Sequence, residues 1–391
     1  MISSTSIPPL RWAFFLMSIG YLTWAPRIPD IKDRLDLTVD QLGACFMVVG
    51  VVGLFLSGVV ARVIARLGSR RAVLVAMPVM VASNALIAFA NSVPVLLLGL
   101  AFSSFCTFII NTAVTTQANN LRDAGFGNQL NSLTAIANLG SVFAILVGTA
   151  LLTTLSTEAY VMGLSVAVGI GIMFAASRLS PVDAVATTEH YPPMRWLGKG
   201  TLLFWFTAFG LFASTTAEFS VNDWSAILSR DDFHIVAPLY LVPFFTFQTG
   251  IVLSRFSATR LGQRFGEGRF VRANAVVCAI AWMVSIQTSQ ILGASAPMAT
   301  VLVAALGFFV AGWGVGPIYP AFVSATARSG YPPAVILPRV FAITSLAFVF
   351  GPGIIGLLSR NAGLPLAMLL PGLMLVTAGI FSVRVVAGAK I

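Results

Sequence analysis

The chain has 391 residues, of which 58% are hydrophobic and only 9% are charged, and its mean hydropathy is +0.92. A soluble domain carries roughly 25% charged residues, so this composition excludes an ordinary soluble protein and predicts an all-α integral membrane protein. The formal net charge of +10 does not indicate a nucleic-acid partner, because the basic residues lie in short loops beside apolar segments, where anionic lipid headgroups account for them.

The first half of the chain contains apolar segments for six membrane helices. The segment at residues 12–26 has no small-residue cleavage site after it, so it is interpreted as a first helix and not as a removed signal peptide. A spanning helix needs about 20 mainly apolar residues. The charge-free run at 72–121 is therefore predicted to cross twice, with its turn at Asn91-Ser92-Val93-Pro94. The other runs lie at 41–61, 124–157 and 159–177.

The second half repeats this plan after a polar stretch at 179–198 that we interpret as a cytoplasmic linker. The run at 273–327 is again long enough for two crossings, with a turn near Ser295-Ala296-Pro297. The remaining segments lie at 200–222, 233–254, 340–359 and 361–383. The whole pattern predicts about twelve transmembrane helices.

The distribution of basic residues predicts the orientation. Assigning alternate loops to opposite sides leaves only Arg27, Lys32, Arg34, Arg230 and Arg360 on one side. The side rich in Lys and Arg is cytoplasmic, so both termini are predicted to be cytoplasmic and the chain to lie in the plasma membrane. The cytoplasmic set includes Arg62, Arg71, Arg178, Arg255, Arg269, Arg272 and Arg328.

Two short sequences recur in the same order in the two halves. PPLRW at 8–12 recurs as PPMRW at 192–196, and RLGSR at 66–70 recurs as RLGQR at 260–264. Together with the two double-length runs, these repeats indicate two related six-helix halves, residues 1–178 and 199–391.

This organisation resembles the major facilitator superfamily across essentially the whole chain. WAPRIPDIKDRLDLT at 24–38, EFSVNDWS at 218–225 and GPIYP at 316–320 are more narrowly similar to a bacterial permease branch related to the fucose permeases. The resemblance implies alternating access and gating by the basic loops, here Arg66, Gly68, Arg70, Arg260, Gly262 and Arg264. Ala65 and Thr259 replace the acid that is usual in those loops, so how the gate closes is not carried over.

Glu218 is the main candidate for ion coupling. At 100° per residue, one face of its helix carries Thr207, Leu211, Ser214, Thr215, Glu218, Asn222 and Ser225. An ionised acid facing lipid costs on the order of 2.5 kcal/mol or more, so Glu218 is expected to face a protein or water interior. The stripe is interpreted as the lining of an outward-opening cavity, with Asp223 and Trp224 at the membrane interface. Glu218 as a helix-end cap is the alternative.

Further candidate residues for binding a solute lie on other helices. Asn111 with Thr115, and Thr134 with Asn138, form polar faces that either line a cavity or bond across a helix interface. Arg27, beside Trp24, is expected to hold a solute carboxylate, to pair with Glu218 when the outer mouth closes, or to act only as an interfacial anchor. Aromatic and amide side chains that suit a sugar ring or a flat solute are Tyr240, Gln248, Trp313 and Tyr319.

The predicted function is secondary transport of a small polar organic solute, such as a sugar, with proton coupling through Glu218. An exporter of amphipathic compounds is the alternative within transport, and a membrane sensor or scaffold is the alternative of another class. Only His190 and His234 are present and no nucleotide-binding loop is found, so no enzyme, metal site or cofactor is predicted. Cys45, Cys106 and Cys278 are expected to be packing residues, and the protein is expected to be a monomer.

The predicted topology is open to a labelling experiment. Cysteines introduced at Ser69 and Gln263 are expected to react with a membrane-impermeant maleimide only from the cytoplasmic side, and a cysteine at Asp36 only from outside. Labelling of the residue 69 variant from outside contradicts the orientation.

Overall fold

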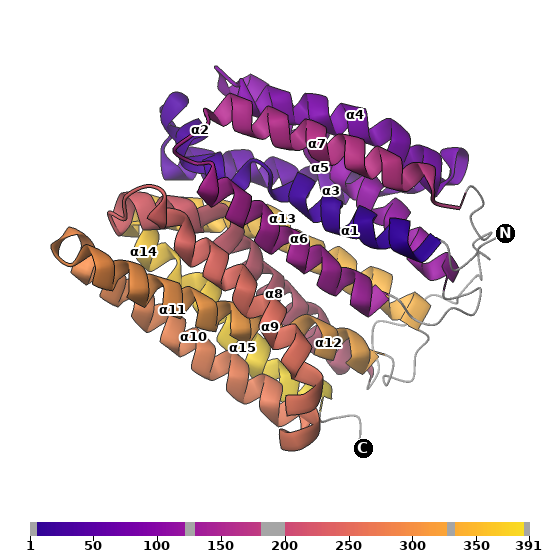
Figure 1. Ribbon diagram of the computed structural model, residues 1–391. Coiled ribbons are helices and arrows are strands. Elements are labelled where there is room, and N and C mark those ends of the chain that lie inside the picture. Colours follow the sequence, from indigo (N-terminus) through magenta and orange to yellow (C-terminus); the bar gives the residue numbers. More distant parts are fainter. Residues whose placement is uncertain (1–5, 122–129, 181–199, 327–332, 387–391) are drawn as a thin grey trace. The chain divides into compact units, whose positions relative to one another are not determined.

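The computed structural model describes residues 6–121, 130–180, 200–326 and 333–386. These residues form helices joined by short turns, which confirms the all-α prediction (Figure 1). Ten helices in this part of the chain are long and apolar enough to cross a membrane. The chain is therefore a multi-pass membrane protein.

The helices gather into two compact units. The first unit contains Met1–Thr38 and Val51–Thr187, and the second contains Val39–Gly50 and Thr188–Ile391. Helix α3 (Val39–Leu67) thus contributes its first residues to the second unit and the rest to the first. The recurrence of PPMRW and most of the expected linker at 179–198 lie outside the described residues, so the division at that linker stays a prediction.

The first unit is a bundle in which α1 packs against α6 and α7, while α4 packs against α5 and α7 (Figure 1). Its helices besides α3 are α1 (Ile7–Leu22), α2 (Ile28–Arg34), α4 (Ser69–Ala88), α5 (Val93–Leu121), α6 (Leu130–Ala150) and α7 (Thr157–Ser177).

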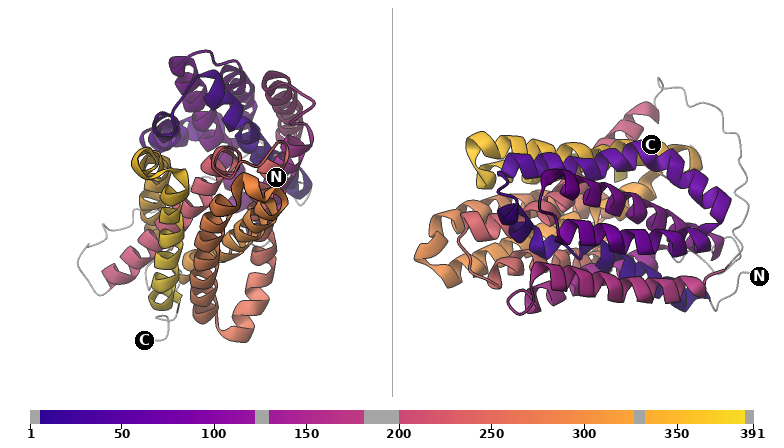
Figure 2. Two further views of the ribbon diagram at one scale, coloured as in Figure 1. Left: turned by 90° about the vertical axis from the view of Figure 1, so that its left-hand side faces the viewer. Right: turned by 90° about the horizontal axis from the view of Figure 1, so that it is seen from above.

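In the second unit, α8 packs against α13 and α15, and α11 packs against both α9 and α10. Figure 2 shows the chain from two further sides. Its helices are α8 (Gly200–Ile227), the π-helical turn η4 (Leu228–Asp232), α9 (Val242–Phe265), α10 (Glu267–Leu292), α11 (Pro297–Val315), α12 (Ile318–Thr326), α13 (Pro333–Ala362), α14 (Leu364–Ala367) and α15 (Leu369–Val386).

Prolines decide where the first helix starts and stops. Pro8 lies in the first turn of α1, where its missing N–H is not needed. The helix ends at Leu22, four residues before the predicted end, because Pro26 has no N–H to donate to the Leu22 carbonyl. A short 3₁₀ turn, η2 (Ala25–Arg27), then leads into α2.

The two turns predicted inside the long apolar runs are confirmed. Helix α4 ends at Ala88 and α5 begins at Val93, while α11 begins at Pro297 after the turn η6 (Gly293–Ser295). Each run therefore holds two helices, as its length required.

One predicted correspondence between the halves is wrong. Gly68 lies between α3 and α4 with φ of 77°, a left-handed value that favours glycine. Gly262 does not occupy a matching turn, because it lies inside α9. The turn between α9 and α10 is instead made by Gly266, with φ of 82°. A glycine in a helix costs only about 1 kcal/mol, so RLGQR stays helical and the chain turns at the next glycine.

Glycines bring α9 and α11 into close contact. A Cβ atom added at Gly312 would lie 2.0 Å from the carbonyl oxygen of Phe247, and one added at Gly250 would lie 2.2 Å from that of Phe309. Because the atoms met are backbone atoms, no side-chain rotation relieves these contacts. The two helices therefore pack backbone against backbone.

This packing gives a stability prediction. Gly312→Ala is expected to lower the free energy of unfolding by about 1–3 kcal/mol, because α9 and α11 must separate to admit the methyl group. Thermal unfolding of the purified protein in detergent measures the change. Gly163→Ala in α7 is the control, since an added Cβ there meets no atom within 4 Å and stability should be unchanged or raised. Equal unfolding temperatures for the two variants contradict the close-packing account.

Candidate functional site

An ion pair between α8 and α9 lies within the second unit. Glu218 Oε2 is 3.7 Å from Arg255 Nη2, and each side chain is 22% exposed. Glu218 thus faces a partly accessible protein interior, in agreement with the expectation from its helical face. The sequence places Arg255 in the cytoplasmic set of loop residues, but it lies inside α9. Charge counting misses it because the charge-free run simply ends there.

The break between α11 and α12 explains why Arg255 is held where it is. Pro320 lacks the N–H that would bond the carbonyl of Gly316 in a continuous helix. Arg255 Nε donates to that oxygen instead, at 3.3 Å. Pro317 removes the donor for Trp313 in the same way, and Asn274 Nδ2 donates to the Trp313 oxygen at 3.0 Å. Neither Arg255 nor Asn274 is among the sequence-based candidates, although the proline spacing marks both orphaned carbonyls.

Aromatic side chains adjoin this break. Tyr319 of α12 is 40% exposed and interacts electrostatically with both Arg255 and Glu218. Trp313 of α11 lines an open pocket of about 560 Å³. The other lining residues are Phe256, Ser257, Arg260 and Leu261. The structure therefore places the predicted residues Glu218 and Tyr319 together, and Trp313 at the adjoining helix break.

Two further predicted residues meet at the next turn of α8. Gln248 Nε2 donates to Asn222 Oδ1 at 2.7 Å, and both side chains are buried. Ser214 and Tyr240 are buried as well. The role of these four side chains in binding a solute stays a prediction.

Trp224 does not present its side chain to lipid headgroups, and the position of Asp223 and Trp224 at the membrane interface stays a prediction. The Trp224 side chain is fully buried, and its ring centroid lies 5.7 Å from that of Phe46. Its Nε1 has no hydrogen-bond partner among the described residues, whereas interfacial tryptophans keep their N–H in contact with water or headgroups. Asp223 is half-buried and forms no hydrogen bond or ion pair within the described chain, which makes it a second interior carboxyl that the helical face of Glu218 does not reveal.

The candidates of the first unit are spread along α5 and α6. The Nδ2 atom of Asn138 is buried and has no hydrogen-bond partner in the part of the chain that the structure describes. Asn111 is exposed and accepts a hydrogen bond from Thr115 at 3.4 Å, while Thr134 is exposed. An unpaired buried amide is costly, so Asn138 is the stronger candidate for contact with a solute.

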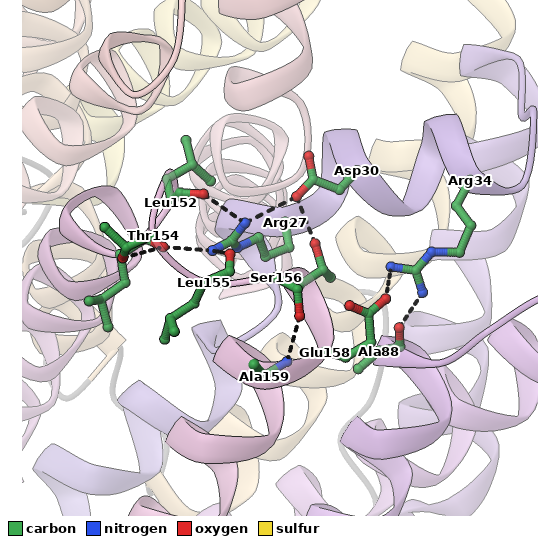
Figure 3. A network of polar contacts seen from close by, with 12 residues as sticks. Arg27, Asp30, Arg34, Ala88, Leu152, Thr154, Leu155, Ser156, Glu158 and Ala159 are labelled. Atoms are coloured by element: carbon green, nitrogen blue, oxygen red, sulfur yellow. Dashed lines mark hydrogen bonds and ion pairs between the residues drawn. The ribbon is translucent and has the colours of Figure 1, made fainter.

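Arg27 is tied into its own unit rather than presented to a cavity (Figure 3). Its side chain is 3% exposed. The guanidinium donates to the carbonyl oxygens of Leu151, Leu152 and Leu155 at 3.0–3.1 Å and pairs with Asp30 at 3.3 Å. These carbonyls follow the end of α6, where most helical donors are missing; that of Leu151 also accepts from the Leu155 N–H. The contacts favour the anchoring role over solute binding for Arg27. Neighbouring Trp24 is buried.

The same polar cluster joins two more helix ends, the start of α7 and the end of α4 (Figure 3). Asp30 accepts from Thr157 Oγ1 at 2.7 Å, at the start of α7. Arg34 pairs with Glu158 at 2.6 Å and also donates to the carbonyl of Ala88, the last residue of α4. A cation at a helix C-terminus and an acid in a first turn both complement the helix dipole.

The predicted gating arginines lie near helix ends. Arg66 is exposed in the last turn of α3, Arg70 is half-buried in α4, and Arg260 and Arg264 are exposed in α9. Arg264 lies over the ring of Phe265, 5.4 Å from its centroid. Their part in gating stays a prediction.

No metal centre is found among the described residues, since no three His, Cys, Asp or Glu side chains are grouped to hold an ion. Cys45, Cys106 and Cys278 are buried free thiols, which agrees with the packing role expected for them.

Comparisons of sequence identify the family. The model of the Major Facilitator Superfamily matches residues 10–337. An uncharacterized MFS-type transporter of Yersinia pestis is 23% identical over 378 residues, covering 94% of this chain and 92% of the relative. An uncharacterized transporter of Sinorhizobium fredii is 25% identical over 362 residues, covering 92% and 93%.

Comparisons of structure agree on the fold. A point mutant of the nucleoside transporter NupG matches with a TM-score of 0.73 at 13% identity, covering 98% of this chain and 99% of that one. A point mutant of the E. coli fucose:proton symporter FucP matches with a TM-score of 0.61 at 15% identity, covering 97% and 98%.

The anchoring of Arg27 is testable by stability. Arg27→Lys keeps the charge but cannot serve three carbonyls and Asp30 at once, so we expect a loss of about 3 kcal/mol or more in the free energy of unfolding. Arg66→Lys, the same substitution at an exposed site, should change it by less than about 0.5 kcal/mol. A stable Arg27→Lys protein that no longer binds solute would instead support the binding role.

Proposed function

The chain belongs to the major facilitator superfamily, whose members are transporters rather than enzymes, and we propose on this basis that it is a secondary transporter of a small polar organic solute. Transport proceeds by alternating access, with the two halves exposing a shared site to each side of the membrane in turn. The lipid bilayer and the solute are its partners.

We propose twelve spanning helices, arranged as two halves of six. The ten helices that meet the length and hydropathy requirements are joined by α1, which has 16 residues, and α8, which has 28. An even number of spans agrees with the sequence-based prediction that both termini are cytoplasmic. The bias of basic residues toward one side supports that orientation in the plasma membrane.

The pair of Glu218 and Arg255 is the observation that carries the proposal. Ionisable residues within spanning helices are costly and mark ion or substrate pathways by default. This pair is loose at 3.7 Å and each side chain is 22% exposed, which supports access of water and a solute to it. Glu218 is therefore proposed to bind and release a proton during the cycle.

Aromatic side chains around the α11–α12 break support a polar solute with a ring. Trp313 and Tyr319 offer flat apolar faces beside polar groups, which suits a sugar-like solute. Two of the similar structures are described as a nucleoside transporter and a fucose:proton symporter, and both solutes are of this kind. An exporter of amphipathic compounds is the second candidate, favoured by the exposed Phe256 in the pocket wall.

The coupling role of Glu218 is tested in two stages. A thermal-shift screen of the purified protein against sugars, organic acids and dyes identifies a solute, because a bound ligand raises stability by RT ln(1 + [L]/Kd). In proteoliposomes, Glu218→Gln is expected to exchange that solute at equilibrium but not to concentrate it under a pH gradient. The amide keeps the size of the side chain and removes its titration.

Asp223→Asn is the matched comparison, since it makes the same change on the same helix without touching the ion pair. It should retain accumulation driven by the pH gradient. Accumulation that survives in Glu218→Gln and disappears in Asp223→Asn moves the coupling to Asp223. Accumulation that survives in both variants refutes coupling through this helix.

A further inference from the structure

We propose that Arg255 binds an anionic group of the transported solute, a carboxylate or a group of similar shape, in competition with Glu218. The inference rests on the proposed transport function and narrows its solute class.

Most of the donors of Arg255 are unused. A guanidinium has five N–H donors, and only Nε makes a hydrogen bond with another described residue, to the carbonyl of Gly316. The 3.7 Å separation from Glu218 exceeds the range of about 2.7–3.2 Å for such a bond. Within the described residues, the two terminal amino groups therefore make no hydrogen bond, and Nη2 makes only the longer ion-pair contact with Glu218.

The orientation of that edge is fixed by the helix break. Because Pro320 leaves the Gly316 carbonyl without a helical donor, the Nε bond holds one side of the planar group against the α11–α12 junction. The opposite fork matches the two oxygens of a carboxylate, which guanidinium groups bind through two parallel hydrogen bonds. A lysine could not offer this geometry.

The charges around the pair favour an anion. Among the described residues of the helices that pack on α8, the ionisable groups that interact with Glu218 are Arg255 and Tyr319. Asp223 lies on the same helix but away from the stripe that carries Glu218. Glu218 is thus the carboxylate that a solute anion would replace at Arg255.

Competition for Arg255 would couple the solute to a proton. When the solute carboxylate takes the fork, Glu218 loses its counter-ion in a segment of low dielectric, where an isolated charge is costly. Glu218 then takes up a proton from water and becomes a neutral acid. The solute anion and the proton enter together, so the loaded site gains no net charge.

The test uses the full-length protein in detergent and two matched pairs of probes: gluconate with sorbitol, and benzoate with benzyl alcohol. At least one carboxylate is expected to raise the unfolding temperature, and its neutral partner is not. Arg255→Gln should weaken carboxylate binding by at least about tenfold, a loss of roughly 1.4 kcal/mol, while Arg255→Lys should weaken it less. Glu218→Gln should strengthen it, because the competing carboxylate is gone.

A second readout separates binding from folding. In weakly buffered solution, anion binding should take up a proton in the wild-type protein and none in Glu218→Gln. That comparison remains valid if Arg255→Gln fails to fold. The assignment of Arg255 is overturned if only the neutral probes stabilise the protein or if no carboxylate does. It is also overturned if carboxylate binding is weaker in Glu218→Gln. Loss of solute exchange in proteoliposomes, with Arg255-dependent carboxylate binding intact, refutes the transport function and not the anion site.

Discussion

The need to bond every main-chain carbonyl inside a membrane determines where this protein places its interior cations. Water cannot serve the exposed ends and breaks of helices there, so side chains from neighbouring helices must. Arg27 bonds three carbonyls beyond the end of α6, and Arg255 and Asn274 bond those left open by two prolines in the α11–α12 region. What differs is how completely each cation is used. Arg27 is nearly saturated, whereas Arg255 keeps donors to spare.

That difference distinguishes an arginine with a structural role from one that is available to bind a solute. A buried arginine that is surrounded by carbonyl oxygens and an acid has little left to offer a ligand, so Arg27 holds helices together. An arginine that makes one hydrogen bond and lies far from its acid still has N–H donors with which to bind a ligand. The loose pair with Glu218 can therefore exchange partners at modest cost, which a tight, dry ion pair could not.

Much of the architecture could be predicted from the sequence, because in a membrane hydropathy and length constrain the helices strongly. The double crossings, their turns and the interior orientation of Glu218 follow from apolar runs, prolines and one helical face. Side-chain partners could not be predicted in this way. Charge alone assigns Arg255 to a loop, although it lies inside α9 and bonds the carbonyl of Gly316. The interfacial expectation for Trp224 does not reveal its burial against Phe46. The recurring RLG sequence pairs Gly262 with Gly68. The backbone angles show instead that Gly266 makes the turn.

The backbone contact between α9 and α11 has a mechanical consequence. With Gly250 and Gly312 leaving no side-chain layer between them, sliding or tilting of one helix against the other would bring backbone atoms into collision, so the two helices are expected to move together. Beyond them the helical hydrogen bonding is interrupted at Trp313 and Gly316 by two prolines, and the short helix α12 packs against α8 and α15 instead. Arg255 bonds the chain at this break, so a ligand on its remaining N–H groups would contact the point where the α9–α11 pair gives way to α12.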